Sequence, residues 1–190
     1  MVDFEEDIKK CIETLNRGGV ILYPTDTIWG LGCDALNEQA TDKIYEIKQR
    51  PKEKSMIVLL AEARDLLQYV AAPHPDIIAI AESFGRPTTV VYYNALDLPR
   101  NVINSDGSIA IRVTDDPFCK ALIKRLRKPL ISTSANISGQ PSPAVFSMIS
   151  NDIVSKADYV VKYRQNDTTP RSPSRLVKIN DDGEVFVLRS

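Results

Sequence analysis

The sequence predicts a mixed α/β fold, in which helices pack on a sheet of parallel and antiparallel strands. Helical and strand patterns alternate in the first half of the chain, and a hairpin pattern ends it. The composition agrees, because 43% of the 190 residues are hydrophobic and 26% are charged, as in ordinary globular proteins. A chain of this length predicts one domain that covers residues 1–190.

The first part of the chain predicts two helices and two buried strands. Residues 4–17 place apolar side chains at helical spacing, and a Gly-Gly pair ends that helix. The run "VILYP" is typical of a buried strand that ends at its proline. Asn37 is a candidate cap for a helix that runs into Lys48, and "MIVLL" follows as a second buried strand.

The second part predicts more strands than helices. Two short helices are expected around residues 62–70 and 75–84, before the β-branched strands "TTVVYY" and "IAIRV". Asp116 followed by Pro117 begins a helix that reaches Arg127, because aspartate caps helices and proline suits their first position. "PLIST" is a strand that leads directly into a serine-rich loop. "DYVVKY", "SRLVKI" and "EVFVL" are the last strands, and a "DDG" turn joins the final two as a hairpin.

Charge and cysteine content exclude several classes of protein. The formal net charge of −1 argues against a general binder of polyanions. The acidic start "VDFEED" is unlike an export signal, and no apolar run is long enough to span a membrane. Cys11, Cys33 and Cys119 are odd in number and lack a C-x-x-C pair, which argues against disulfides or a zinc site. We therefore expect a cytoplasmic protein whose cysteines are small core residues.

Conventional catalytic motifs are missing from the sequence. His74 is the only histidine and lies between two prolines, so a catalytic triad or a histidine base is not expected. No G-x-x-x-x-G-K-[ST] motif occurs, which excludes a P-loop. The chemistry must therefore come from other polar groups.

The first two polar loops follow a strand and a helix. In "YPTDTIWGLGCDA", Thr25, Asp26 and Thr27 stand at the strand exit, and Gly30 and Gly32 suggest a turn in which backbone can approach a ligand. The alternative is a capped turn that satisfies its own polar groups. In "KQRP", Lys48 and Arg50 stand at a helix exit as a flexible cation and a rigid fork, which suits phosphate or carboxylate. A solvated helix end is the alternative there.

The third polar loop is the serine-rich stretch "ISTSANISGQPSP". It offers Ser132, Ser134, Asn136 and Ser142 directly after a buried strand, which favours a functional loop over a disordered linker. Together the three loops describe an anion site without a nucleophile or a conventional base. Such a site positions charged substrates and stabilises developing phosphoryl charge, as nucleotidyl transfer requires.

At these residues the sequence resembles a known family. "YPTDTIWGLGCDA", "KQRPKEKSMIVL", "AIRV" and "STSANISGQPSP" occur in the order found in the YrdC-like family of L-threonylcarbamoyl-AMP synthases. The family's K-x-R and S-x-N signatures appear as Lys48-Gln49-Arg50 and Ser134-Ala135-Asn136. The resemblance runs from about residue 10 to the end of the sequence. Within the family, the chain is similar to the short bacterial type, which is without a second C-terminal domain.

The resemblance implies a fold and a reaction. The implied fold is a twisted mixed sheet flanked by helices, with a concave, positively charged cavity on one face. The implied reaction joins L-threonine, bicarbonate and ATP into threonylcarbamoyl-adenylate and releases pyrophosphate. Mg²⁺ is expected to arrive with ATP rather than in a protein cage. The product would pass to the tRNA threonylcarbamoyl-transferase complex, and contact with tRNA or double-stranded RNA is a further expectation.

The resemblance also implies roles for individual residues. Lys48 and Arg50 are the implied catalytic residues, since they would offset the repulsion between carboxylated threonine and the α-phosphate. Arg112 has a plain alternative, a strand-end arginine in a surface ion pair. The implied nucleotide contacts are Lys48, Arg50, Ser134, Asn136, Ser142 and Ser174, and the implied threonine or bicarbonate contacts are Thr25, Arg112 and Ser132.

Two stretches depart from the family pattern. Lys54, Ser55 and Met56 replace an N-P-L-like triplet, and Leu59 stands where many members have a histidine. The segment "FGRPTT", Phe84 to Thr89, replaces an aromatic-Pro-Gly-Pro segment. These departures leave two alternatives open: a divergent paralogue with another or weak carbamoyl-adenylate activity, and a non-catalytic module that binds RNA.

Overall fold

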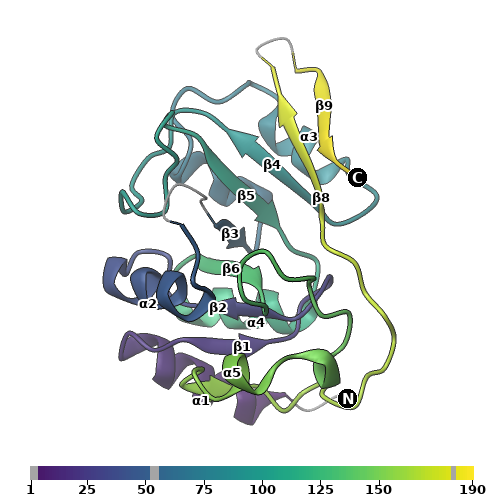
Figure 1. The fold of residues 1–190 in the computed structure, drawn as a ribbon. Helices are drawn as coiled ribbons and strands as arrows, with labels where there is room; N and C mark the ends of the chain where they lie inside the picture. The colour runs from purple at the N-terminus through teal and green to yellow at the C-terminus, as the bar shows by residue number, and fades with distance from the viewer. Residues whose placement is uncertain (1–3, 52–55, 181–182) are drawn as a thin grey trace.

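The protein folds around one mixed β-sheet. The computed structural model describes residues 4–51, 56–180 and 183–190. Over these residues nine strands line up in the order β7-β1-β2-β6-β3-β5-β4-β8-β9 (Figure 1). The strands are β1 (Ile21–Tyr23), β2 (Gly30–Gly32), β3 (Ile57–Leu60), β4 (Thr88–Tyr92), β5 (Ile109–Val113), β6 (Leu130–Ser134), β7 (Tyr159–Val160), β8 (Arg175–Ile179) and β9 (Val185–Arg189).

Helices flank the sheet, as the sequence predicts. Side-chain caps set the starts of two of them, α2 and α4. The Asn37 side chain accepts a hydrogen bond from the Ala40 amide at 3.0 Å. The Asp116 carboxylate accepts one from the Cys119 amide at 3.0 Å, and Pro117 occupies the first helical position. The helices are α1 (Glu5–Asn16), α2 (Glu38–Lys48), α3 (Ile77–Glu82), α4 (Pro117–Leu126) and α5 (Asn151–Val154), with 3₁₀ helices η1 (Ala63–Gln68) and η2 (Phe146–Met148).

The sheet is mixed in the way that the sequence indicates. β3 runs parallel to β5 and antiparallel to β6, while β4 runs antiparallel to β5 and parallel to β8. β8 and β9 form the expected antiparallel hairpin, whose "DDG" turn lies partly outside the described residues. β6 therefore lies in the middle of the sheet, between β2 and β3, and delivers its C-terminal end to the serine-rich loop.

Several elements differ from the prediction. β2 is a strand where we expected a turn, and its glycines make room for neighbours: a Cβ on Gly32 would lie 2.6 Å from the Tyr23 ring and 2.7 Å from the Ile131 carbonyl. The helix expected at 62–70 is the shorter 3₁₀ helix η1, and the one expected at 75–84 is only α3. The strand expected in "DYVVKY" stops after two residues, because the Asp7 carboxylate accepts the amides of Lys162 and Tyr163.

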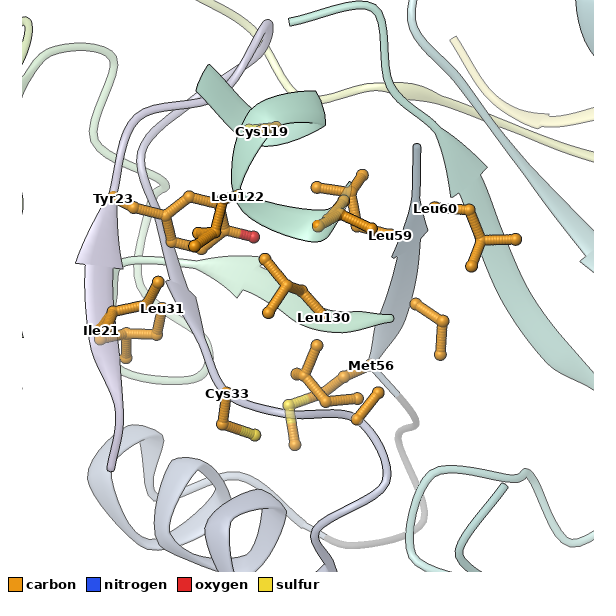
Figure 2. Packing of buried hydrophobic residues seen from close by; sticks show 14 of the residues in the cluster. Ile21, Tyr23, Leu31, Cys33, Met56, Leu59, Leu60, Cys119, Leu122 and Leu130 are labelled. Carbon is orange, nitrogen blue, oxygen red and sulfur yellow. The ribbon is translucent and has the colours of Figure 1, made fainter. Parts of the chain in front are cut away.

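The core lies between the sheet and the helices. Tyr23, Leu31, Leu59, Leu122 and Leu130 are each 0% exposed and come from β1, β2, β3, α4 and β6 (Figure 2). Burying a side chain of this size contributes about 1.5–3 kcal/mol, so this layer fixes the central strands firmly.

Two further features concern the cysteines and the last strand. Cys11, Cys33 and Cys119 are free and buried in this core, as expected, and burial raises the pKa of each thiol, that of Cys33 to about 12. β9, by contrast, is exposed along its whole length at the edge of the sheet, with Val187 53% and Leu188 54% exposed (Figure 1).

Candidate active site

A cavity of about 310 Å³ opens on one face of the sheet. Successive residues of β5 mark this face, because Ala110 and Arg112 line the cavity while Ile111 and Val113 line a separate hollow on the opposite face. The cavity's polar lining is Thr27, Arg50, Asn104, Arg112, Ser132, Thr133, Ser134, Ser142, Ser174 and Arg189. Three arginines and no acidic residue belong to the described lining. The positive potential of the cavity remains a prediction.

Arg112 is buried at the floor of the cavity and held in a fixed orientation. Its side chain is 3% exposed, and its Nη1 donates to Asp26 Oδ1 at 2.7 Å and to Thr27 Oγ1 at 3.1 Å. Its Nε has no hydrogen-bond partner among the described residues. An unpaired donor on a buried guanidinium is costly to leave unsatisfied, so it favours an additional acceptor such as an anionic substrate group. The ion pair that we considered as an alternative exists, but at the cavity rather than at the surface.

Thr25 and Thr27 have different roles in the turn after β1. Thr25 is 2% exposed, and its hydroxyl donates to the Ile28 carbonyl at 2.8 Å while accepting the Thr27 amide at 3.0 Å. The turn therefore satisfies its own polar groups, as our structural alternative expected. Thr27, which the sequence analysis placed at the strand exit without a substrate role, lines the cavity instead. Direct contact between Thr25 and substrate remains a prediction.

Lys48 and Arg50 point in different directions from the end of α2. Gln49 between them adopts a left-handed conformation with φ 49°, which ends the helix. The Lys48 side chain is 1% exposed, and burial, followed by the charge of Arg50, lowers its pKa to about 7. Arg50 lines the cavity, and partial burial lowers its pKa too. Of the two implied catalytic residues, only Arg50 belongs to the cavity lining.

The serine-rich loop contributes serines to the cavity but keeps its asparagine within the loop. Ser132, Ser134 and Ser142 line the cavity, as the sequence analysis anticipated. The Asn136 amide instead donates to the Ile137 carbonyl at 3.0 Å and the Gln140 carbonyl at 2.7 Å. Asn136 is absent from the lining, and its implied contact with nucleotide remains a prediction.

The C-terminal hairpin supplies the remaining wall. Ser174 is 4% exposed, shares a 2.7 Å hydrogen bond with the Thr89 hydroxyl, and lines the cavity. Arg189 also lines the cavity and donates to the Ser174 carbonyl at 3.0 Å. The sequence analysis missed Arg189, since the expected strand "EVFVL" stopped one residue before it. It also missed Asn104, which lies in a loop without a recognisable motif.

The positions that depart from the family pattern fall in four places. Lys54 and Ser55 lie outside the described residues. Met56 is buried and lines the cavity. Leu59 is fully buried in β3, beside Arg112 in the strand register, and does not line the cavity. Phe84 to Thr88 line the opposite hollow of about 440 Å³, whereas Thr89 reaches Ser174 at the cavity. Most of the departing segment therefore lies on the other face of the sheet.

The described part of the chain has neither a cluster of metal-binding side chains nor a membrane-spanning helix. No group of three or more His, Cys, Asp or Glu residues there could hold a metal ion. None of its helices has the length and apolarity to cross a membrane.

Comparison with known proteins identifies the family. The family model Sua5_yciO_yrdC, described as "Telomere recombination", matches residues 13–190. A threonylcarbamoyl-AMP synthase of Pseudoalteromonas translucida (strain TAC 125) is 35% identical over 185 residues, which cover 96% of this chain and 97% of the relative. One of Marinobacter nauticus is 35% identical over 171 residues, 88% of each chain. The chain belongs to the Sua5/YciO/YrdC family.

Solved structures agree on the fold. P. abyssi Sua5 complexed with L-threonine matches with a TM-score of 0.84 and 25% identity, over 97% of this chain and 54% of that chain. This chain thus spans about half the length of that Sua5 protein. E. coli YciO matches with a TM-score of 0.83 and 22% identity, over 97% of this chain and 89% of YciO. The twisted mixed sheet flanked by helices is therefore the family's fold.

Proposed function

We propose that this member of the Sua5/YciO/YrdC family is an L-threonylcarbamoyl-adenylate synthase, a nucleotidyltransferase that acts on L-threonine, bicarbonate and ATP. Relatives at 35% identity over nearly the whole chain carry the name threonylcarbamoyl-AMP synthase. The observation that carries the proposal is the gathering of Arg50, Arg112 and Arg189 with serine hydroxyls around one cavity without a described acidic side chain.

The reaction needs such a cavity because it brings two anions together. The amine of threonine first combines with bicarbonate to give a carbamate and water. A carbamate oxygen then attacks the α-phosphorus of ATP, and the bond to the leaving pyrophosphate breaks. At an atomic separation of about 4 Å, two like charges repel by about 4 kcal/mol in a protein-like dielectric. Preorganised guanidinium groups offset that repulsion and stabilise the charge that develops at phosphorus.

The cavity suggests how the substrates divide between its walls. Arg50 and Ser134 of the family signature, with Ser142 and Ser174 from the wider resemblance, would bind the nucleotide, and all four line the cavity. Arg112, whose Nη1 contacts Thr27 and whose Nε has no hydrogen-bond partner among the described residues, would bind the carboxylate or carbamate of the threonine substrate, with Ser132 also in the lining. Mg²⁺ carried with ATP, transfer of the product to a tRNA-modifying complex, contact with RNA and a cytoplasmic location remain predictions.

The decisive experiment measures pyrophosphate release by the purified protein in buffer free of carbon dioxide. Threonine and bicarbonate are omitted in turn, and the product is identified by its mass. Release that requires both, and that Arg50→Ala prepared in parallel lacks, supports the proposal. Release that requires neither substrate contradicts it.

A divergent paralogue would give a different pattern in the same assay. Pyrophosphate release that needs bicarbonate but accepts another amine in place of threonine indicates another carbamoyl-adenylate activity. No release from ATP, together with RNA binding that salt abolishes, indicates a non-catalytic RNA module.

A further inference from the structure

The four signature residues of the K-x-R and S-x-N motifs do not all face the cavity. Arg50 and Ser134 line it. Lys48 and Asn136, in contrast, direct their side-chain nitrogens at backbone carbonyls of the loop that follows β6. This loop, residues 134–140, begins at Ser134 and leads toward Ser142, and both of these serines line the cavity.

Lys48 ties the end of α2 to this loop through three hydrogen bonds. Its Nζ donates to the carbonyls of Ser134 and Asn136, at 2.5 and 2.7 Å. Its own carbonyl accepts the amide of Ser138 at 2.8 Å. The side chain is almost completely buried, so these carbonyls take the place of water around the nitrogen. Moving Nζ to a substrate phosphate would leave two carbonyls without their donor.

The protonation of Lys48 fits the same role. Burial lowers its pKa to about 7, and Arg50 is the charged group whose field adds to that effect. Above that pH the group is an amine with two N–H donors, which matches the two carbonyls that it contacts. The contacts therefore do not depend on the positive charge.

Asn136 closes the loop on itself. Its Nδ2 donates to the carbonyls of Ile137 and Gln140, at 3.0 and 2.7 Å. These acceptors fix the orientation of the amide, because only an N–H group can satisfy two carbonyls. Both N–H groups of the amide are thus used within the loop, and no N–H is left for a phosphate. The remaining Oδ1 is buried without a hydrogen-bond partner among the described residues.

We infer that Lys48 and Asn136 are positioning residues that hold loop 134–140 in place, while Arg50 and Ser134 make the contacts with substrate. The inference rests on the proposed function, since it divides the work within the proposed ATP site. It also changes what the family signature means in this chain: the first residue of K-x-R and the last of S-x-N act on substrate through the backbone of the loop.

The test compares Lys48→Met with Arg50→Met in the full-length protein. Hydrogen exchange of the Ser138 amide reports whether the loop is held, and calorimetric affinity for ATP at 0.05 and 0.5 M salt reports direct charge contacts. We expect Lys48→Met to speed exchange across 134–140 at least tenfold and to keep the salt dependence of the wild type. Arg50→Met should flatten the salt dependence and leave the exchange unchanged.

Two controls keep the test decisive. Lys43→Met removes another lysine of α2, whose Nζ donates to the Gly18 carbonyl, and should change neither measurement. If Lys48→Met does not fold, Asn136→Ala takes its place, because it loosens the same loop without changing any charge. A measurement of proton uptake when ATP binds to the wild type at pH 8 needs no mutation. We expect no uptake, because Lys48 is neutral at this pH and its Nζ keeps its hydrogen bonds to the Ser134 and Asn136 carbonyls.

The outcomes separate this inference from the proposed function. A Lys48→Met variant that flattens the salt dependence but leaves exchange unchanged overturns the positioning role, as does uptake of about one proton by the wild type. Failure of the wild type to release pyrophosphate concerns the proposed function instead, and leaves the exchange measurement as an independent reading of the loop.

Discussion

Two walls of the cavity are built in opposite ways. The first, residues 48–50 with loop 134–140, follows a central strand and is fastened by Lys48 and Asn136. The second, the β8–β9 hairpin, lies at the edge of the sheet, where every residue of β9 is exposed. Yet both provide arginines to the same cavity, Arg50 from the first and Arg189 from the second. We call them the fastened wall and the edge wall.

This contrast teaches that neighbouring ligand contacts can differ in how well they are preorganised. Groups held by buried hydrogen bonds keep their geometry while charge develops, and such groups contribute most to catalysis. Groups on an exposed edge strand open locally at lower cost and adapt their position to a ligand. The edge wall is therefore expected to influence binding, and the fastened wall to influence turnover.

The largest effect is expected from Arg50→Ala in the fastened wall. Loss of one preorganised charge contact should lower turnover about a hundredfold or more. Pyrophosphate release at saturating substrates measures this effect, with Lys43→Ala as the matched exposed-helix control. Turnover within threefold of the wild type would break the proposed distinction between the walls.

A smaller effect is expected from Arg189→Ala in the edge wall. The guanidinium lines the cavity but belongs to an exposed strand, so its loss should raise the KM for ATP about tenfold and change kcat little. Steady-state kinetics with ATP varied separates the two constants. A fall in kcat as large as that of Arg50→Ala would show that both walls are equally preorganised.

The next effect sharpens the assignment within the fastened wall. Ser134→Ala removes a neutral hydroxyl, and a hydrogen bond of about 1 kcal/mol corresponds to a roughly fivefold weaker affinity for ATP. Threonine affinity should change less. The single tryptophan, Trp29, lines the cavity, so its fluorescence can report both titrations. A larger loss for threonine would exchange the two proposed subsites.

The last expected effect concerns the stability of the fastened wall, measured as a free energy of unfolding. Lys48 has a pKa of about 7 in the folded protein, against 10.5 ordinarily, so between these values the unfolded chain binds a proton that the folded chain lacks. The free energy of unfolding contributed by Lys48 therefore rises with pH across this window. Urea unfolding at pH 7 and pH 9 should show this gain in the wild type relative to Lys48→Met. Identical pH dependence in both would mean that Lys48 is not buried as described.

Much of the fold was predictable because its signals are local. Asn37 and the Asp116-Pro117 pair cap helices by contacts within three residues, and both helices begin where the sequence predicts. β2 was not predictable, because its glycines fit against Tyr23 and the backbone of β6, which are brought there only by folding. The shortened β7 has a similar cause, since Asp7 from α1 takes over its backbone amides.

For the candidate site, the sequence predicted which residues belong to it better than it predicted which way their side chains point. The motifs led to Arg50, Arg112, Ser132, Ser134 and Ser174, all of which line the cavity. The same motifs could not reveal which side chains line the cavity. Lys48 and Arg50 are separated only by Gln49, and its left-handed backbone, which the motif does not encode, precedes Arg50 and follows Lys48. Arg189 has no motif, and only the pairing of β8 with β9 brings it beside Leu176 at the cavity.

The buried cysteines make the protein suitable for site-specific labelling. With their pKa values raised by burial, Cys11, Cys33 and Cys119 hold few reactive thiolates at neutral pH, so maleimide reagents should leave the native protein unmodified. A cysteine introduced in place of Met148, which is 64% exposed, would then carry the only dye. Its neighbour Phe146 packs on Trp29 with ring centroids 4.7 Å apart, which places that dye close to the cavity wall without occupying it.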